Sequence, residues 1–467
     1  MYKVLLKKFL SFSIGNWITM IIAISTTPII TRLFEPAVFG MYSMYTLVIN
    51  IILIISILGS DQSYMRYFNT VENKAALLFK CLKISFISFF IIGIVAFIFR
   101  TQLSIFIISK NDIVLIYLII AGLFINMINR FMLTVIRMKQ NAKLYSFVSV
   151  STKITEVSLI ITFFFNVGET VYSLIFASII SNLVIMIFLI FNNRKLISGI
   201  KSKSNITTKE ILGYGIPFTF SLIVFWLFES IDKISLRQFS SLEELGLFAA
   251  AMKLVGIVVI IQASFQTFWT PVALEKFERK NEERFFSNIN LIVGFVMLVM
   301  GIAIIFSSDI VKVILGENYN SVSDILPFLL LGPIMYTVSE TTVMGINFYK
   351  KTGWHIVIAV IACISNIIGN LLLVPSLGAK GAAISTGISY IVFFVMRTNI
   401  SSRFFKVDYQ IKKYYLGTLI LVLYALYATL YNASLLHYLM GIVSLLLLFL
   451  IYLKDLREII NFIKKSK

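Results

Sequence analysis

The chain has few of the residues that build disulfide frameworks or metal sites. It contains two cysteines and two histidines in 467 residues, and only 13% of its residues are charged. Cys81 and Cys363 both lie in apolar stretches, so a disulfide framework is not indicated. His355 and His437 have no evident partners in the sequence for a metal site. We therefore expect the chain to use no metal and no other cofactor.

Motifs for nucleotide hydrolysis and for covalent catalysis are missing as well. The sequence has no GxxxxGK[ST] loop, so we do not expect the chain to hydrolyse ATP. Two histidines with no nucleophile placed beside them give no triad of the hydrolase kind. These absences predict a protein that is not an enzyme and favour transport without covalent chemistry.

Apolar residues are what the chain has in abundance. They make up 59% of it, and the mean hydropathy is +0.93, more apolar surface than a soluble fold can bury. The runs are continuous and do not alternate as strands of a membrane barrel would. Since about 20 apolar residues cross a bilayer, we predict an all-α polytopic membrane protein with about fourteen transmembrane helices, at residues 10–31, 40–60, 78–99, 113–134, 145–167, 171–191, 211–231, 246–267, 287–307, 323–348, 353–374, 380–398, 414–432 and 435–453.

The basic residues support this count and give it an orientation. If the spans alternate from a cytosolic amino terminus, most of the 41 Lys and Arg residues fall in cytosolic segments, including residues 397–413 and 454–467. Both termini are then cytosolic. The net charge of +19 is explained by the anionic inner leaflet, so nucleic acid is not expected as a partner. The basic, apolar amino terminus is interpreted as a retained first helix.

A weak internal repeat predicts two related lobes. Arg32-x-Phe34 matches Arg237-x-Phe239, and the Gly-x-aromatic pattern that follows Arg32 also follows Arg237. A polar, basic segment at residues 192–210 separates the two copies. We therefore predict parallel repeats: an N-terminal lobe of six spans at residues 1–200, a C-terminal lobe of six spans at 201–410, and two extra helices with a basic tail at 411–467.

Charged residues inside apolar spans are the best candidates for a transport site. Each charge is energetically costly in lipid unless it is paired with an opposite charge or hydrated in a cavity. Lys253 lies near the middle of its span with no acid within one helical turn, and either meets an anion in a cavity or pairs with an acid of another helix. Lys153 and Glu156 are three residues apart, so self-pairing is favoured over ion coupling. Glu340 is a candidate for ion coupling, with an interhelical hydrogen bond as the favoured alternative.

Two arginines occupy matching places at the predicted outer mouths of the lobes. Arg32 and Arg237 either grip phosphate in bidentate fashion or anchor helix ends in lipid headgroups. The candidate binding cations are therefore Lys253, Arg32, Arg237 and Lys153. Asp61 and Arg66 are expected to form a surface ion pair.

Several short stretches, in their order along the chain, resemble one known family. The chain is similar to bacterial Wzx-type polysaccharide flippases, the polysaccharide transport family of the multidrug/oligosaccharidyl-lipid/polysaccharide exporter superfamily. Asp232-Lys233 resembles an Asp-Arg pair of that family, with lysine in place of arginine, and Phe248 stands where the family has tyrosine. The stretches that carry the resemblance are residues 28–40, 231–233, 246–253, 266–271 and 370–383.

The resemblance implies fourteen helices and a function. The implied substrate is an oligosaccharide repeat unit linked through pyrophosphate to undecaprenol, moved from the cytosolic to the outer face for O-antigen, capsule or exopolysaccharide synthesis. Membrane lipid and the polysaccharide polymerase or ligase machinery are the implied partners, and coupling to Na⁺ or H⁺ entry stays open.

Two alternatives belong to other classes. A multidrug or organic-cation antiporter of the same superfamily needs an anionic cavity and normally twelve spans. A membrane polymerase or ligase needs a large extracytoplasmic loop, and the longest predicted outside loop, residues 307–322, is short.

Overall fold

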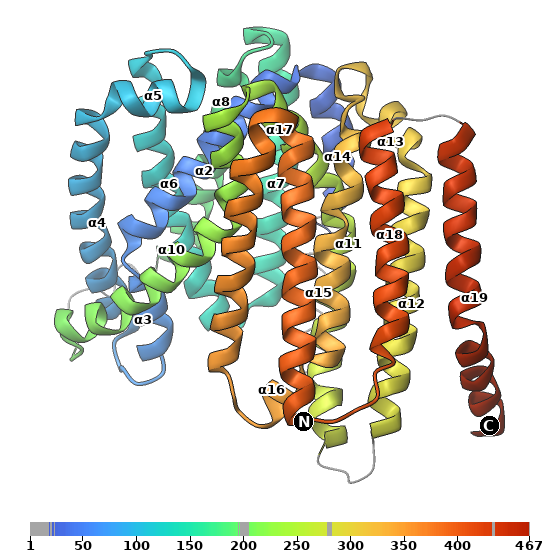
Figure 1. Ribbon diagram of the computed structural model, residues 1–467. Coiled ribbons are helices and arrows are strands. Elements are labelled where there is room, and N and C mark those ends of the chain that lie inside the picture. Colours follow the sequence, from blue (N-terminus) through green and yellow to red (C-terminus); the bar gives the residue numbers. More distant parts are fainter. Residues whose placement is uncertain are drawn as a thin grey trace. The chain divides into compact units, whose positions relative to one another are not determined.

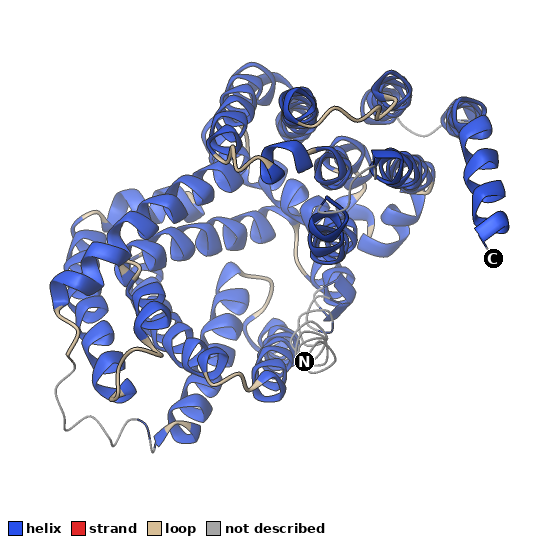
Figure 2. Ribbon diagram, turned by 90° about the horizontal axis from the view of Figure 1, so that it is seen from below, coloured by secondary structure: helices blue, strands red, loops and turns tan. Residues whose placement is uncertain are grey.

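The chain folds into membrane-length helices. The computed structural model describes residues 18, 21–22, 24–194, 196, 205–277, 283–431 and 435–466. Every regular element among these residues is a helix (Figure 2). Twelve of the described helices are long and apolar enough to cross a membrane. The prediction of an all-α polytopic membrane protein is confirmed.

The helices form two compact units, residues 1–233 and 234–467. The described helices of the first unit (Figure 1) are α2 (Pro36–Ile57), α3 (Ser60–Tyr67), α4 (Lys74–Ile98), α5 (Arg100–Ile108), α6 (Ile113–Met138), α7 (Ala142–Val167), α8 (Val171–Asn192) and most of α10 (Thr208–Phe239).

Polar caps set where helices of the first unit begin. The side chains of Asn73, Asp112 and Asn141 accept hydrogen bonds from backbone N–H groups in the first turns of α4, α6 and α7. Such caps satisfy donors that have no partner within the helix. α7 ends at Gly168, whose φ of 94° favours glycine. The short polar connections between apolar runs therefore act as start and stop signals.

A cluster of apolar side chains joins the first described segment to α7 and α8. Phe34 is 1% exposed and packs with Ile160, Leu174 and Ala177. Its ring meets the ring of Phe164 edge-on, with 5.4 Å between the centroids. This packing fixes the end of the helical segment 24–33, which carries Arg32.

The second unit is built around a cluster of buried aromatic and aliphatic side chains. Trp269, Phe286 and Val343 are among its members. The helices of this unit after α10 are α11 (Leu242–Phe277), α12 (Glu283–Phe306), α13 (Ser308–Leu315), the 3₁₀ helix η1 (Glu317–Tyr319), α14 (Val322–Leu329), α15 (Leu331–Thr342), α16 (Met344–Phe348), α17 (Gly353–Phe404), α18 (Ile411–Tyr431) and α19 (Leu435–Ser466).

α17 is a helical hairpin and not one straight helix. Gly378 has φ 54° and ψ −130°, which breaks the helix into two arms. A Cβ atom on Gly381 would lie 2.4 Å from the carbonyl oxygen of Leu373, and one on Gly369 would lie 2.4 Å from the hydroxyl of Ser385. The close contact of the arms therefore needs glycine at these positions.

The fourteen predicted spans can now be compared with the helices. The two arms of α17 correspond to the predicted spans at 353–374 and 380–398, and eleven other described helical spans match the remaining predictions after the first. The first predicted span, 10–31, lies largely outside the described residues. The span predicted at 323–348 is divided among α14, α15 and α16. The boundary at 200/201 also lies outside the described residues, and the division into repeats stays a prediction.

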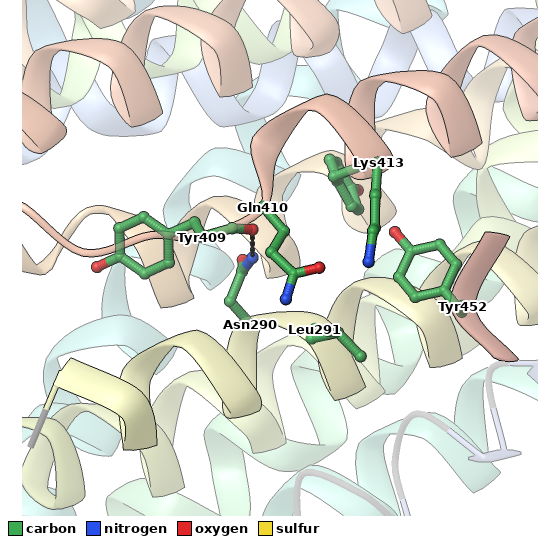
Figure 3. A pocket seen from close by; sticks show the side chains of 7 residues that line it. Asn290, Leu291, Tyr409, Gln410, Lys413 and Tyr452 are labelled. Carbon is green, nitrogen blue, oxygen red and sulfur yellow. Dashed lines mark hydrogen bonds between the residues drawn. The ribbon is translucent and has the colours of Figure 1, made fainter. Parts of the chain in front are cut away.

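A small polar cavity lies where α12, α18 and α19 meet. Figure 3 shows Asn290 donating a hydrogen bond to the backbone oxygen of Tyr409, with a distance of 3.1 Å. Lys413, which also lines the cavity, pairs with Asp455 at 2.6 Å and so ties α18 to α19. The cavity measures about 10 Å³, enough for one water molecule and too small for a sugar.

Candidate functional site

The first half of α10 is fixed against the break between α2 and α3. Leu58 and Gly59 both have positive φ, 51° and 63°, which ends α2 and starts α3 in a new direction. A Cβ atom on Gly59 would lie 2.2 Å from the carbonyl oxygen of Gly215, so the two backbones touch. The hydroxyl of Ser63 donates to the carbonyl oxygen of Ile211, at 2.7 Å. These contacts place the following turns of α10, up to Lys233, beside α2.

A cleft opens between α2, α6 and α10 within the first unit. It has a volume of about 310 Å³ and combines cationic, acidic, amide, hydroxyl and aromatic side chains. The residues that line it are Thr46, Leu47, Asn50, Leu53, Ile54, Arg130, Leu222, Phe225, Trp226, Glu229, Ser230 and Lys233.

Arg130 is held at the cleft by a buried carboxylate. Its Nε lies 2.9 Å from Oδ2 of Asp61, whose side chain is 3% exposed, while the side chain of Arg130 is 32% exposed. The amide of Gln62 donates to the same carboxylate oxygen, at 3.1 Å. Because a guanidinium carries five N–H donors and Nε contributes one, Arg130 keeps its two terminal NH₂ groups for a ligand. Removing either partner would leave a charge unpaired in an apolar setting.

Lys233 gives the cleft a second cation. Glu229 and Lys233 are four residues apart on α10 and both line the cleft, in the order that favours attraction along a helix. Asp61 and Glu229 thus balance Arg130 and Lys233, which lowers the cost of keeping four charges among apolar helices. The arrangement provides two cationic groups that can meet phosphate oxygens.

Neutral groups complete the lining of the cleft. Asn50 and Ser230 offer an amide and a hydroxyl, which suit sugar hydroxyls, and Trp226 offers an aromatic surface. The cleft therefore suits a ligand with an anionic group beside polar and apolar parts.

The predicted site residues lie elsewhere in the described structure. None of the six candidates, Lys253, Arg32, Arg237, Lys153, Glu156 and Glu340, is among the residues that line this cleft. Among the residues that line the cleft, Lys233 is recognisable from the sequence, because Asp232-Lys233 resembles the Asp-Arg pair of the flippase family. Arg130 has no comparable signal in the sequence, because its partner, Asp61, lies 69 residues away and was expected to pair with Arg66.

Lys153 and Glu156 form the self-paired unit that their spacing favours. Nζ of Lys153 lies 2.8 Å from Oε2 of Glu156. The hydroxyl of Tyr42 donates to the other carboxylate oxygen of Glu156, at 3.1 Å, so the acid joins α2 to α7. Any ligand or coupling ion at this position would have to compete with these two partners.

Three further candidates sit on helix surfaces. Arg32 is exposed in the last turn of the helical segment 24–33, Arg237 is partly exposed in the last turns of α10, and Lys253 is exposed on α11. Exposure leaves each accessible, and their roles in binding stay predictions.

Glu340 has a buried partner, Arg397, which the charge pattern of the sequence wrongly predicts in a cytosolic segment. Nη1 of Arg397 lies 2.8 Å from Oε1 of Glu340, and the two side chains are 7% and 4% exposed. Arg397 was counted in a cytosolic segment, but α17 continues to Phe404 and buries it. Nη1 also donates to the hydroxyl of Ser339, at 2.8 Å. The interaction of Glu340 is thus an interhelical ion pair.

Aromatic side chains enclose this ion pair. The guanidinium of Arg397 lies 5.3 Å from the ring centre of Tyr336 and 5.2 Å from that of Phe393. The indole N–H of Trp269 donates to the backbone oxygen of Glu340, at 3.0 Å. The ion pair therefore joins α15 to α17, and the hydrogen bond from Trp269 joins α15 to α11 within the second unit.

The surface ion pair expected between Asp61 and Arg66 is wrong. Asp61 is buried and bonds Arg130 of α6, because α3 turns its first residues towards the helices of the unit. Across the described residues, no three or more His, Cys, Asp or Glu side chains gather in a way that would hold a metal ion.

Comparison with known families gives a match that covers nearly all of the first unit and the beginning of the second. A family model described as "Polysaccharide biosynthesis protein" matches residues 5–275, more than half of the chain. The chain is also similar to the probable low-salt glycan biosynthesis flippase Agl15 of Haloferax volcanii, with 23% identity over 223 residues. That alignment covers 46% of this chain and 47% of the relative, so the chain spans about half the length of the curated relative it matches.

Two solved structures have folds similar to that of this chain. The chain is similar to the lipid II flippase MurJ in an inward closed conformation, with a TM-score of 0.70, 16% identity and coverage of 95% of this chain and 99% of the other. It is also similar to an inward-facing multidrug resistance MATE family transporter of the MOP superfamily, with a TM-score of 0.59, 16% identity and coverage of 83% and 94%. At this identity the likeness is one of fold.

Proposed function

Because the chain belongs to the family of polysaccharide biosynthesis proteins, we propose that it is a flippase for a polyprenyl-pyrophosphate-linked oligosaccharide. It moves the repeat unit from the cytosolic to the outer face of the bacterial plasma membrane by alternating access. The product serves O-antigen, capsule or exopolysaccharide synthesis, with the polymerase or ligase as the next partner. The flippase named among its relatives and the flippase fold support this proposal.

We propose the cleft of the first unit as the binding site for the pyrophosphate and the first sugar. Arg130, fixed by Asp61, and Lys233 present two cations between membrane-spanning helices. In the proposed mechanism they bind the pyrophosphate, because phosphate oxygens match the NH₂ groups of a guanidinium. Asn50, Ser230 and Trp226 contact the first sugar. Arg32, Arg237, Lys253 and Lys153 are proposed as further cations along the path.

Energy for transport has two proposed sources. An anion that leaves an inside-negative cell gains about 2.3 kcal/mol per charge per 100 mV. Entry of Na⁺ or H⁺ is the second source, with Glu156 and Glu340 as the proposed coupling groups. Since each carboxylate is paired with a cation, a coupling ion would act by displacing Lys153 or Arg397.

A leaflet assay tests the proposal. Proteoliposomes that contain the full chain and an undecaprenyl-pyrophosphate oligosaccharide labelled on the sugar are treated with a membrane-impermeant glycosidase. We expect the protein to raise the cleavable fraction from the outer-leaflet share towards completeness. Arg130→Gln and Lys233→Gln should each slow this approach about tenfold, the loss expected for one charge-assisted hydrogen bond.

The control is Lys143→Gln, which removes an exposed cation of the same unit that does not line the cleft. Its rate should equal that of the wild type. If the wild-type chain leaves the glycolipid in its original leaflet, the proposed function fails. If transport proceeds but both cleft variants keep the full rate, the function stands and the cleft is not its binding site.

A drug or organic-cation antiporter is the second candidate. The fold likeness to a MATE family transporter favours it, whereas Arg130 and Lys233 in the cleft count against a cationic substrate. Export of a cationic dye from the same proteoliposomes, without movement of the glycolipid, would favour this alternative.

A further inference from the structure

An open groove in the second unit lies at the turn between α16 and α17, far along the chain from the cleft. Its volume is about 480 Å³, and it is lined by Lys350, Lys351, Thr352, Gly353, Trp354 and Val357. All six residues are exposed. In Figure 1 the turn follows α16, at the end of the first arm of α17 opposite its bend.

The two lysines are presented by a fixed turn. Lys350 has φ 53°, a left-handed conformation that is uncommon for residues other than glycine. Its N–H bonds the carbonyl oxygen of Asn347 at 3.1 Å, and the N–H of Lys351 bonds that of Ile346 at 2.9 Å. These bonds close the end of α16. No acidic side chain among the described residues forms an ion pair with either lysine, so the turn carries two uncompensated positive charges.

An exposed aliphatic stripe begins at the same groove. Along the first arm of α17, large side chains recur every three or four residues, so they share one face of the helix. The members of this stripe are 43% to 52% exposed: Val357, Val360, Ile364, Ile368 and Leu371. At a rise of about 1.5 Å per residue the stripe runs ~21 Å, which is longer than the ~15 Å hydrocarbon depth of one leaflet, so an acyl chain can follow it over its length in that leaflet. Trp354, between lysines and stripe, suits the interface of a membrane.

We propose that this groove binds the headgroup of an anionic phospholipid, whose acyl chain follows the aliphatic stripe of α17. Lys350 and Lys351 meet the phosphate, the hydroxyl of Thr352 offers a further donor, and Trp354 packs at the level of the glycerol. The combination of two cations at one end and an apolar stripe at the other matches the charge and shape of such a lipid. The inference does not depend on the proposed transport activity.

The strength of the site favours a bulk phospholipid over the transported glycolipid. Near an anionic surface each basic residue contributes about a fivefold gain in association. Two lysines on an open groove thus give about a 25-fold preference for an anionic over a zwitterionic lipid. A preference of this size is enough for an abundant phospholipid to occupy the groove. It is too small for the groove to bind a scarce glycolipid selectively.

Fluorescence quenching tests the site directly. The full chain is reconstituted in phosphatidylcholine vesicles with increasing fractions of phosphatidylglycerol brominated on its acyl chains, and the quenching of tryptophan emission is measured. The same measurement is made on the Trp354→Phe variant. The difference in quenching between wild type and variant comes from Trp354 and therefore reports lipid bound at the groove. We expect this difference to show about a 25-fold preference for brominated phosphatidylglycerol over brominated phosphatidylcholine.

The decisive variant is Lys350→Gly combined with Lys351→Gln. Glycine accepts the left-handed conformation at position 350, so the charge is removed without strain. In this variant the quenching of Trp354 should show about equal binding of phosphatidylglycerol and phosphatidylcholine, and the thermal unfolding temperature should be unchanged. The matched control, Arg403→Gln with Lys406→Gln, removes two exposed cations where the second arm of α17 ends, on the same side of the hairpin as the groove. Neither residue lines the groove, so this variant should keep the full preference.

Two outcomes would overturn the proposal. Equal quenching by the two brominated lipids would show that the groove does not select an anionic headgroup. Full displacement of brominated phosphatidylglycerol by undecaprenyl phosphate at a small mole fraction would assign the groove to the polyprenyl carrier instead.

Discussion

Arg397 and Glu340 form an ion pair inside the second unit, with Nη1 and Oε1 2.8 Å apart and both side chains less than a tenth exposed. The pair joins the second arm of α17 to α15, and the aromatic rings of Tyr336 and Phe393 flank the guanidinium. A buried pair of this kind gives little net stability compared with apolar residues, but breaking it leaves one charge without compensation.

The first prediction concerns that pair. Glu340→Met or Arg397→Met alone should lower the free energy of unfolding by ~3–5 kcal/mol, because the remaining charge stays buried. The double variant should recover most of the loss. Unfolding of the three variants in detergent gives the coupling energy. Additive losses in the double variant would mean that the two residues act independently.

The second prediction tests the contact that fixes α10 in the first unit. Gly215→Ala should destabilise the chain, because its Cβ would lie 2.5 Å from the carbonyl oxygen of Leu58, and backbone cannot move aside cheaply. Gly213→Ala, two residues away on the same helix, meets nothing within 4 Å and should be neutral or stabilise by up to ~1 kcal/mol through helix propensity. Similar unfolding temperatures for both variants would contradict the close approach.

The third prediction concerns the cations predicted from the sequence. Arg32→Ala and Lys253→Ala should each slow flipping of the labelled glycolipid by roughly tenfold if they contact the pyrophosphate during transport. Both side chains are exposed, so membrane insertion and unfolding temperature should be unchanged. Lys110→Ala, another exposed cation, serves as the control. Wild-type rates in both variants would assign these residues to structure.

The fourth prediction is a pH dependence at α13. The hydrogen bond from Lys312, at 2.7 Å, followed by one from Tyr438, lowers the pKa of Asp309 below its ordinary value. A carboxylate with a lowered folded-state pKa stabilises the fold above its unfolded pKa, and that stabilisation is lost as the pH falls through the folded value.

The comparison with Asp309→Asn measures this contribution. The wild type should unfold at a slightly higher temperature than the variant at pH 6. The difference should begin to shrink as the pH falls below about 4 and should disappear below the lowered folded-state pKa of Asp309. Because Asp309 is partly exposed, the effect should be small. A difference that grows on acidification would show that the carboxylate does not gain from these bonds.

The sequence by itself determined the class of protein and most of its helices. Apolar runs and their polar boundaries are local properties, so their lengths and the caps at Asn73, Asp112 and Asn141 can be recognised without knowledge of the fold. The pairing of Lys153 with Glu156 was predictable for the same reason, since three residues along a helix bring two side chains together.

Only the tertiary structure decided which distant charges meet. Asp61 bonds Arg130, 69 residues later, and Glu340 bonds an arginine that hydropathy alone placed at the membrane surface. A run of apolar residues shows that a helix can cross the membrane, but it does not show which face turns towards a neighbour. The cleft lined by α2, α6 and α10 depends on such facing, which the contact of Gly59 with Gly215 sets through packing between residues far apart in the chain.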